Sequence, residues 1–370
     1  MNKKIGIITF HSAHNYGASL QCYALQETLK KKGYDTKIIN YRNNKIDKNF
    51  KILTFNRTSF KQFIRSILVN IILIKKNIKR NRAFENFINN QLNLSKKYKT
   101  EEELKKDFPD YDVYITGSDQ VWSYNLLGEL EDSYTLNFGN SKTKRISYAA
   151  SVGNPESIII HKEEFCEKLK NIDFLSVREN ETKENLNKIM NRNIEVTLDP
   201  ALLLDKNEWE EKIKNKENEK EKYIFVYAIG EHPENLKIAN YLSERTGLKI
   251  IHVEKRNKYN NILKNAYESG PFEFINYVKN AEYVVTTSFH ATVFSVIFNK
   301  KLWTVPPLDT GCRITNLLKR LNMDNRVVYT LEEFKNKKYD EEIDYSNINK
   351  ILKEERKKSI DWLINSIEVK

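Results

Sequence analysis

The stretch IGIITFHSAHNYGASLQCYALQETLKKKGYDTKIINY, residues 5–41, decides the fold class of this chain. It opens with a compact apolar run at 5–10, which is typical of a strand buried in a parallel sheet. A polar loop follows, and then an amphipathic helix over 18–32 that Gly33 ends. A second strand is predicted at 36–41. This pattern predicts a βαβ unit, whose crossover is expected to be right-handed.

The same alternation continues to the end of the chain. Further strands are predicted at 112–116, 146–150, 174–177, 194–198, 223–229, 249–253, 282–286 and 301–305. Further helices are predicted at 59–92 (with a break near Lys75), 233–245, 271–280, 290–299, 314–321 and 345–366. Two consecutive α/β arrays predict two doubly wound, Rossmann-like domains that face each other across a cleft.

A highly charged segment at 206–222 separates the two arrays. It surrounds one tryptophan, Trp209, and predicts a solvated helix and linker. We therefore expect an N-terminal domain over 1–205 and a C-terminal domain over 206–345. The last segment, 346–370, is expected to be a helix that packs back on the N-terminal domain.

The chain has 370 residues and a formal net charge of +12. An excess of positive charge attracts phosphorylated metabolites, nucleic acid or anionic lipid. General enrichment in lysine explains the same excess. No nucleic-acid-binding module is recognisable, so we expect no nucleic-acid partner.

Three widely spaced cysteines predict no disulfide framework and a reducing compartment. No secretory signal is recognisable, and the longest apolar stretch, 64–74, is shorter than the ~20 residues that a spanning helix needs. We expect a cytoplasmic protein. The basic helix at 59–92 leaves two interpretations open: a half-buried surface helix, or contact with anionic lipid at the inner face of the membrane.

Ligands of open parallel sheets bind at the carboxyl ends of the strands. The first such loop carries Asn15, Tyr16 and Gly17, which suit an anion or sugar hydroxyls, although ordinary turn chemistry explains them too. In a second loop, Gly117-Ser118-Asp119-Gln120-Val121-Trp122, Asp119 and Gln120 can bind vicinal hydroxyls and Trp122 can stack on a sugar face. Ser118 or Asp119 as a helix N-cap is the alternative.

Three further loops carry side chains that can bind anions. Arg178 follows an apolar strand and can bind carboxylate or phosphate, or form a salt bridge with Glu179 or Glu181. Thr287 and Ser288 precede a helix whose first turn holds His290, a combination that suits phosphate with an acid/base group attached.

The last of these loops, 309–313, ends in Arg313, which is either an anion ligand or a solvated arginine at a helix start. No spacing typical of a metal triad, a nucleotide-phosphate loop or a nucleophilic serine occurs.

Taken in order, these motifs resemble the polysaccharide pyruvyltransferase family over residues 5 to about 325. The matching pieces are Asn15-Tyr16-Gly17-Ala18, Gly117-Ser118-Asp119-Gln120-Val121-Trp122, Ile146-Ser147-Tyr148-Ala149-Ala150-Ser151, Ser176-Val177-Arg178-Glu179, Leu198-Asp199-Pro200, Ser288-Phe289-His290-Ala291-Thr292 and Arg313. Ala291 departs from the glycine expected in many relatives.

The resemblance implies a two-domain fold similar to that of GT-B glycosyltransferases, with neither a metal nor a bound cofactor. It implies transfer of a pyruvyl group from phosphoenolpyruvate to a sugar of a bacterial surface polysaccharide or its lipid-linked precursor. Arg178 and Arg313 would bind the donor's carboxylate and phosphate, and His290 would act as general acid or base. The loops at 15–17 and 118–122 would face the sugar.

Two other functions stay open at this point. A glycosyltransferase of the same fold would use a nucleotide sugar and need a pocket for base and ribose. A non-catalytic glycan-binding protein would bind sugar without releasing phosphate, and a cluster of anion-binding arginines with a histidine would be superfluous in it. Donor preference separates these possibilities.

Overall fold

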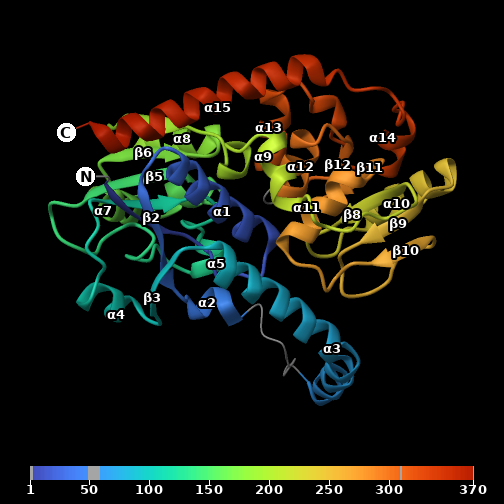
Figure 1. Ribbon diagram of the computed structural model, residues 1–370, viewed down its shortest axis with the longest axis horizontal. Coiled ribbons are helices and arrows are strands. Elements are labelled where there is room, and N and C mark those ends of the chain that lie inside the picture. The colour runs from blue at the N-terminus through green and yellow to red at the C-terminus, as the bar shows by residue number, and fades with distance from the viewer. Residues whose placement is uncertain (1–2, 49–58, 309–310, 370) are drawn as a thin grey trace.

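The computed structural model describes residues 3–48, 59–308 and 311–369, and its core consists of two parallel sheets flanked by helices (Figure 1). The larger sheet has the strand order β3-β2-β1-β4-β5-β6-β7. Its strands are β1 Lys4–Ile8, β2 Asp35–Tyr41, β3 Leu94–Tyr98, β4 Val113–Gly117, β5 Lys144–Ala150, β6 Phe174–Val177 and β7 Ile194–Val196. The order reverses between β1 and β4, where open α/β sheets bind their ligands.

The smaller sheet has the order β10-β9-β8-β11-β12. Its strands are β8 Tyr223–Tyr227, β9 Lys249–His252, β10 Ile262–Asn265, β11 Tyr283–Thr286 and β12 Lys301–Thr304. Its order reverses between β8 and β11. The predicted α/β class with two doubly wound sheets is therefore confirmed.

The helices lie on the faces of these sheets and between them. They are α1 Tyr16–Lys31, α2 Asn44–Asp47, α3 Phe60–Gln91, α4 Glu101–Lys106, α5 Tyr124–Leu127, α6 Glu156–Ile160, α7 Lys162–Leu169, α8 Asn180–Ile189, α9 Lys206–Ile213, α10 Pro233–Thr246, α11 Pro271–Asn280, α12 Phe289–Ile297, α13 Cys312–Arg320, α14 Leu331–Lys335 and α15 Tyr345–Glu368. In the described ranges, short 3-10 helices occur at Pro200–Leu202 and Asp324–Arg326. The predicted break near Lys75 is wrong, because α3 runs through this residue without interruption.

Of the predicted solvated helix and linker over 206–222, the helix is present as α9 with its charged side chains at least partly exposed, but its tryptophan is not solvated. Helix α9 is shorter than the charged segment, and Trp209 on it is fully buried. Its ring packs against Tyr23 of α1 and Phe294 of α12, and its indole N–H donates to the carbonyl of Ala201 at 3.0 Å. A single tryptophan in a run of charges is here the buried face of an amphipathic helix.

Aromatic packing joins the two sheets and their helices into one continuous core. Tyr16, at the start of α1, stacks on Phe274 of α11 with ring centroids 4.3 Å apart. Both residues belong to one buried cluster that also contains residues of the two sheets, such as Ile7 and Val284. The cleft between the sheets is therefore closed at its base by apolar contacts.

Helix α15 begins beside the smaller sheet and runs along the larger one (Figure 1). The backbone N–H of Leu198 donates to the hydroxyl of Ser359 at 3.0 Å, and Nε of Arg356 donates to the carbonyl of Leu202 at 2.7 Å. Near its end, the carbonyl of Ile367 accepts from Nζ of Lys3 at 2.7 Å. None of the helices in the described part of the chain is long and apolar enough to cross a bilayer.

Candidate functional site

A cavity of about 310 Å³ lies between the two sheets, where the loops that follow several strands meet. Its walls come from both halves of the chain: Phe10, Ala13, Asn15, Ala18, Ile46, Asp119, Gln120, Leu126, Ile229, His232, Thr287, Ser288, Phe289, His290, Pro307, Arg313 and Ile314. These residues follow β1, β2, β4, β8, β11 and β12. The position is the one that parallel α/β sheets provide for ligands, at the carboxyl ends of strands.

The start of helix α12 forms one wall of this cavity. Ser288 is its N-cap, as predicted, and the Ser288 side chain accepts from the backbone N–H of Ala291 at 3.4 Å. His290 therefore sits in the first helical turn. Thr287 is held by the backbone N–H of Ile229, which donates to its hydroxyl at 2.9 Å. A helix N-terminus offers unpaired amides and a positive dipole end, both of which favour an anion.

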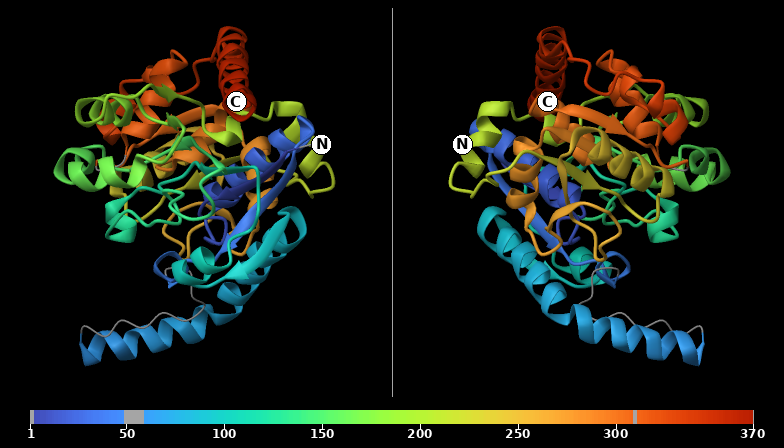
Figure 2. Two further views of the ribbon diagram at one scale, coloured as in Figure 1. Left: turned by 90° about the vertical axis from the view of Figure 1, so that its left-hand side faces the viewer. Right: turned by 90° about the vertical axis from the view of Figure 1, so that its right-hand side faces the viewer.

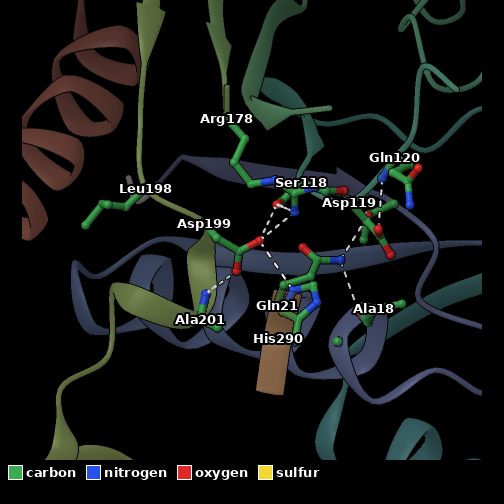
Figure 3. A network of polar contacts seen from close by, with 12 residues as sticks. Ala18, Gln21, Ser118, Asp119, Gln120, Arg178, Leu198, Asp199, Ala201 and His290 are labelled. Carbon is green, nitrogen blue, oxygen red and sulfur yellow. Dashed lines mark hydrogen bonds and ion pairs between the residues drawn. The ribbon is translucent and has the colours of Figure 1, made fainter. Parts of the chain in front are cut away.

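Asp199 is the centre of the polar network behind this wall (Figure 3). Its Oδ2 accepts from the hydroxyl of Ser118 and from Nη1 of Arg178, each at 2.9 Å. Nε2 of His290 lies 3.4 Å from the same oxygen, an ion-pair distance. The backbone N–H of Ala201 donates to Oδ1 at 2.9 Å.

Opposing effects act on the pKa of the Asp199 carboxyl. Burial alone would raise this pKa, but the charges and hydrogen bonds of His290 and Arg178 hold it below its ordinary value. Asp199 is thus a buried carboxylate that can fix the orientation of the imidazole. In the sequence Asp199 belongs to a motif without an assigned role, because nothing local indicates which distant side chains it meets.

Arg178 is buried and already paired with protein carboxylates. Its Nε donates to Glu179 at 3.0 Å and its Nη1 donates to Asp199. Burial would lower the pKa of this guanidinium, but the charges of Glu179 and Asp199 outweigh that effect and raise it. The predicted alternative of a salt bridge to Glu179 is confirmed, whereas Glu181 instead accepts from Asn316. Among the described residues, Nη2 of Arg178 lacks a hydrogen-bond partner.

Arg313 is the arginine that lines the main cavity. It also borders a small cavity of about 30 Å³ that contains Arg178 and Phe289. The two guanidinium carbons lie 4.6 Å (Arg178) and 6.0 Å (Arg313) from the centre of the Phe289 ring. Burial and the nearby charge of Arg178 lower the pKa of Arg313. Two cations thus lie near one aromatic ring, and the carboxylates of Glu179, Asp199 and Asp119 balance part of their charge.

Gly17 and His290 meet across the interface between the two halves of the chain. A Cβ built on Gly17 would lie 1.9 Å from Nδ1 and 2.4 Å from Cγ of the His290 ring. No side chain fits there, so the glycine is required by the close approach of the imidazole. The sequence predicted Gly17 in a substrate-binding loop, but in the structure Gly17 leaves the space that the His290 ring occupies.

Three other predicted residues line the main cavity. Asn15 is the N-cap of α1, and its side-chain oxygen accepts from the N–H groups of Gly17 and Ala18. Asp119 has a left-handed backbone with φ of 69°, which turns the chain after β4. Its neighbour Gln120 also lines the cavity. The predicted helix N-cap at Ser118 or Asp119 is wrong, because the next helix, α5, begins only at Tyr124.

Ser118, Tyr16 and Trp122 do not line the main cavity. Ser118 binds Asp199 from behind it. The phenol oxygen of Tyr16 donates to the carbonyl of Ser269 at 3.0 Å, and the Trp122 indole N–H donates to the carbonyl of Tyr134 at 3.0 Å. Because Tyr16 and Trp122 are fully buried, their placement supports packing rather than contact with a sugar. Of the predicted fifth loop, Asp309 and Thr310 lie outside the described residues.

The fold and the interdomain cavity define a class first. The structure is similar to a UDP-N-acetylglucosamine 2-epimerase from Rickettsia bellii, with a TM-score of 0.54, 12% identity, and coverage of 100% of this chain and 97% of that one. It is also similar to the apo structure of OtsA, with a TM-score of 0.52, 9% identity, and 100% coverage of both chains. These likenesses confirm the GT-B-like fold.

Sequence comparison then identifies the family. The sequence profile of the polysaccharide pyruvyl transferases matches residues 15–306, which include Asn15 and the loops after β4, β6 and β11. The chain therefore belongs to the polysaccharide pyruvyl transferase family, as the ordered motifs predicted. No curated protein sequence matches it.

Proposed function

We propose that this protein transfers a pyruvyl group from phosphoenolpyruvate to two hydroxyls of a sugar, forming a cyclic ketal and releasing phosphate. One observation carries the proposal: Arg313, His290 and the N-terminus of α12 line one interdomain cavity in a chain of this family. Phosphoenolpyruvate has a carboxylate and a phosphate on the same carbon, and this wall has a cation, two hydroxyls at the positive end of a helix dipole and an acid/base group.

In this proposal, the donor binds against α12. Its phosphate would accept from the hydroxyls of Thr287 and Ser288, and its carboxylate would take Arg313. The backbone N–H groups of these two loop residues already donate to Tyr227 and Thr286. Arg178 would act mainly from behind, because two of its nitrogens are engaged by Glu179 and Asp199. Its remaining Nη2 is available for the donor if the ligand reaches the smaller cavity. This shifts the principal donor contact from Arg178 to Arg313.

The reaction needs a proton at the methylene carbon of the donor. His290 would deliver it, and the contact of its ring with Asp199 and the space left by Gly17 support this role. Protonation leaves an oxocarbenium-like carbon that fixed charges in the site would stabilise. One sugar hydroxyl adds to this carbon, the C–O bond to phosphate breaks, and a second hydroxyl closes the ring. The two sugar hydroxyls release two protons. One of them restores the proton that was given to the methylene carbon, and the other leaves with phosphate.

The acceptor would occupy the opposite wall. Asn15, Asp119 and Gln120 reach the cavity from the loops after β1 and β4. Carboxylate and amide groups match vicinal sugar hydroxyls, and Phe10 and Leu126 provide apolar contact. Asp119 is also the carboxylate available as a base for an acceptor hydroxyl. A lipid-linked sugar is compatible with this side, which continues toward the surface at α2 and α5.

Ligand binding tests the donor directly. Thermal unfolding is measured with phosphoenolpyruvate and with a panel of nucleotide sugars, for the wild type, Arg313→Gln and the exposed control Arg256→Gln. A ligand at ~100 times its Kd stabilises the native state by about 2.7 kcal/mol. We expect this shift with phosphoenolpyruvate for the wild type and for Arg256→Gln, and its loss in Arg313→Gln. A shift with nucleotide sugars alone would overturn the proposal and indicate a glycosyltransferase.

Binding without turnover is the remaining alternative. The methyl signal of a new ketal by NMR, together with phosphate release, separates a transferase from a glycan-binding protein on the same fold. We expect His290→Ala to abolish both signals while leaving phosphoenolpyruvate binding within about tenfold of wild type. Near-normal turnover in His290→Ala would refute the acid/base role.

A further inference from the structure

Helix α3 is built of two halves with different surroundings. Its C-terminal half packs on the protein through Phe84, Phe87 and Ile88, all buried. Its N-terminal half extends away from the rest of the molecule, as both side views show (Figure 2). A helix that leaves the globule normally has a polar surface, because nothing there shields apolar side chains from water.

The projecting half of α3 has the opposite composition. Ten of the fifteen residues over 60–74 are Phe, Ile, Leu or Val. Where the side chains are described, Ile71 is 65% exposed and Ile72 is 75% exposed. Ile74 on the same helix is exposed too, and a concentration of exposed apolar side chains on one element marks an interaction surface.

The same helix also concentrates positive charge. Residues 60–84 contain seven Lys or Arg and no Asp or Glu. That is more than half of the chain's formal net charge of +12, in a stretch of 25 residues. The exposed Lys75 and Lys79 stand at the boundary between the apolar half and the packed half. By sequence, the outer half of α3 is mostly apolar, with Lys61 and Arg65 in it, and the basic residues concentrate where the helix meets the globule.

We infer that the outer half of α3 docks on an anionic lipid bilayer. Apolar side chains would enter the boundary between headgroups and acyl chains, and the basic residues would contact anionic headgroups. Charge argues against a second copy of the chain as the occupant, because residues 60–76 contain four Lys or Arg and no Asp or Glu, and pairing two such segments would bring four positive charges against four others. The helix would lie on the membrane rather than span it, in keeping with its basic residues and its length of apolar sequence.

The inner half of α3 is connected by hydrogen bonds to residues beside the cavity. Arg80 donates to the phenol oxygen of Tyr16 at 2.6 Å, to the carbonyl of Tyr267 at 2.9 Å and to the carbonyl of His14 at 3.2 Å. His14 and Tyr16 flank Asn15, which lines the cavity. A bilayer that holds the outer half of α3 would thus be mechanically linked to the loop that follows β1.

Vesicle flotation tests the inference without any need for activity. The full chain is mixed with phosphatidylcholine vesicles that contain or lack phosphatidylglycerol, and the bound fraction is measured. We expect binding to the anionic vesicles only, decreasing with added salt. The double variant Ile71→Ser/Ile72→Ser should bind at least about tenfold more weakly, because two exposed isoleucines no longer enter the bilayer.

A matched control comes from another helix. Ile159 and Ile160 of α6 are also adjacent and exposed, at 43% and 68%. Ile159→Ser/Ile160→Ser should bind vesicles like the wild type. An equal decrease in vesicle binding in both double variants would overturn the inference. So would a wild type that does not bind anionic vesicles. So would light scattering that shows a dimer which only Ile71→Ser/Ile72→Ser dissociates, since the helix would then serve self-association.

Discussion

The contact between Gly17 and His290 makes a sharp prediction for Gly17→Ala. The added Cβ would lie 1.9 Å from Nδ1 of His290, whereas ordinary contact begins at 3.4 Å. Either the start of α1 or the imidazole must therefore move by about 1.5 Å. Overpacking of this kind costs about 1–3 kcal/mol of unfolding free energy. We also expect turnover to fall by about 100-fold, because a shift of this size misplaces the acid/base group.

In the His290→Ala background, Gly17→Ala should raise the free energy of unfolding instead of lowering it. Without the ring the Cβ has room, and alanine at a helical position should stabilise the protein by about 0.5–1 kcal/mol relative to glycine. Unfolding in urea, followed by circular dichroism, measures Gly17→Ala in both backgrounds. The coupling between the two substitutions should reach at least about 1.5 kcal/mol.

Gly247→Ala provides the control. Gly247 ends α10 with φ of 73°, and a Cβ there would meet nothing within 4 Å. Alanine should cost about 1 kcal/mol from backbone strain alone, by the same amount in both backgrounds. If Gly17→Ala also behaved alike with and without the His290 ring, the seating of the imidazole on Gly17 would be refuted.

Three further predictions follow from buried groups. Burial lowers the pKa of His11 and of His252 to about 4. The free energy of unfolding should therefore be highest above about pH 6.5 and should fall toward pH 4, by up to about 1.4 kcal/mol per pH unit for each histidine. Urea unfolding across that pH range measures this decrease, and a flat profile would contradict it. Asp199→Asn should lower kcat far more than it raises the KM for phosphoenolpyruvate. It should also lower the free energy of unfolding by about 3 kcal/mol, because Arg178 loses a buried anion. Unchanged kcat would remove Asp199 from the mechanism. Trp122→Phe should lower the free energy of unfolding by about 1 kcal/mol through the lost hydrogen bond, and should leave the KM for the acceptor unchanged. A raised KM at equal stability would restore a sugar-stacking role for Trp122.

The order of the elements was predictable because strand and helix patterns are local. The buried run at 5–10 and the helix after it correspond to β1 and α1 within a few residues, and Phe174–Val177 and Pro271–Asn280 match β6 and α11. The edge strands β3 and β10 were missed. Strand β3 reads LSKKY, and edge strands commonly carry lysines that blunt their free hydrogen-bonding edge, so they lack the apolar pattern that identifies central strands.

The sequence by itself determined the fold class, the family and the loops that meet at the cavity. These follow from periodicity, from strand ends and from short ordered motifs, all of which are properties of neighbouring residues. Only the tertiary structure decided that Asp199 holds His290, that Arg178 is paired internally and that Gly17 seats the imidazole. Each of these depends on which distant segments pack together, since burial and charge pairing are set by contacts across the interface between the two sheets.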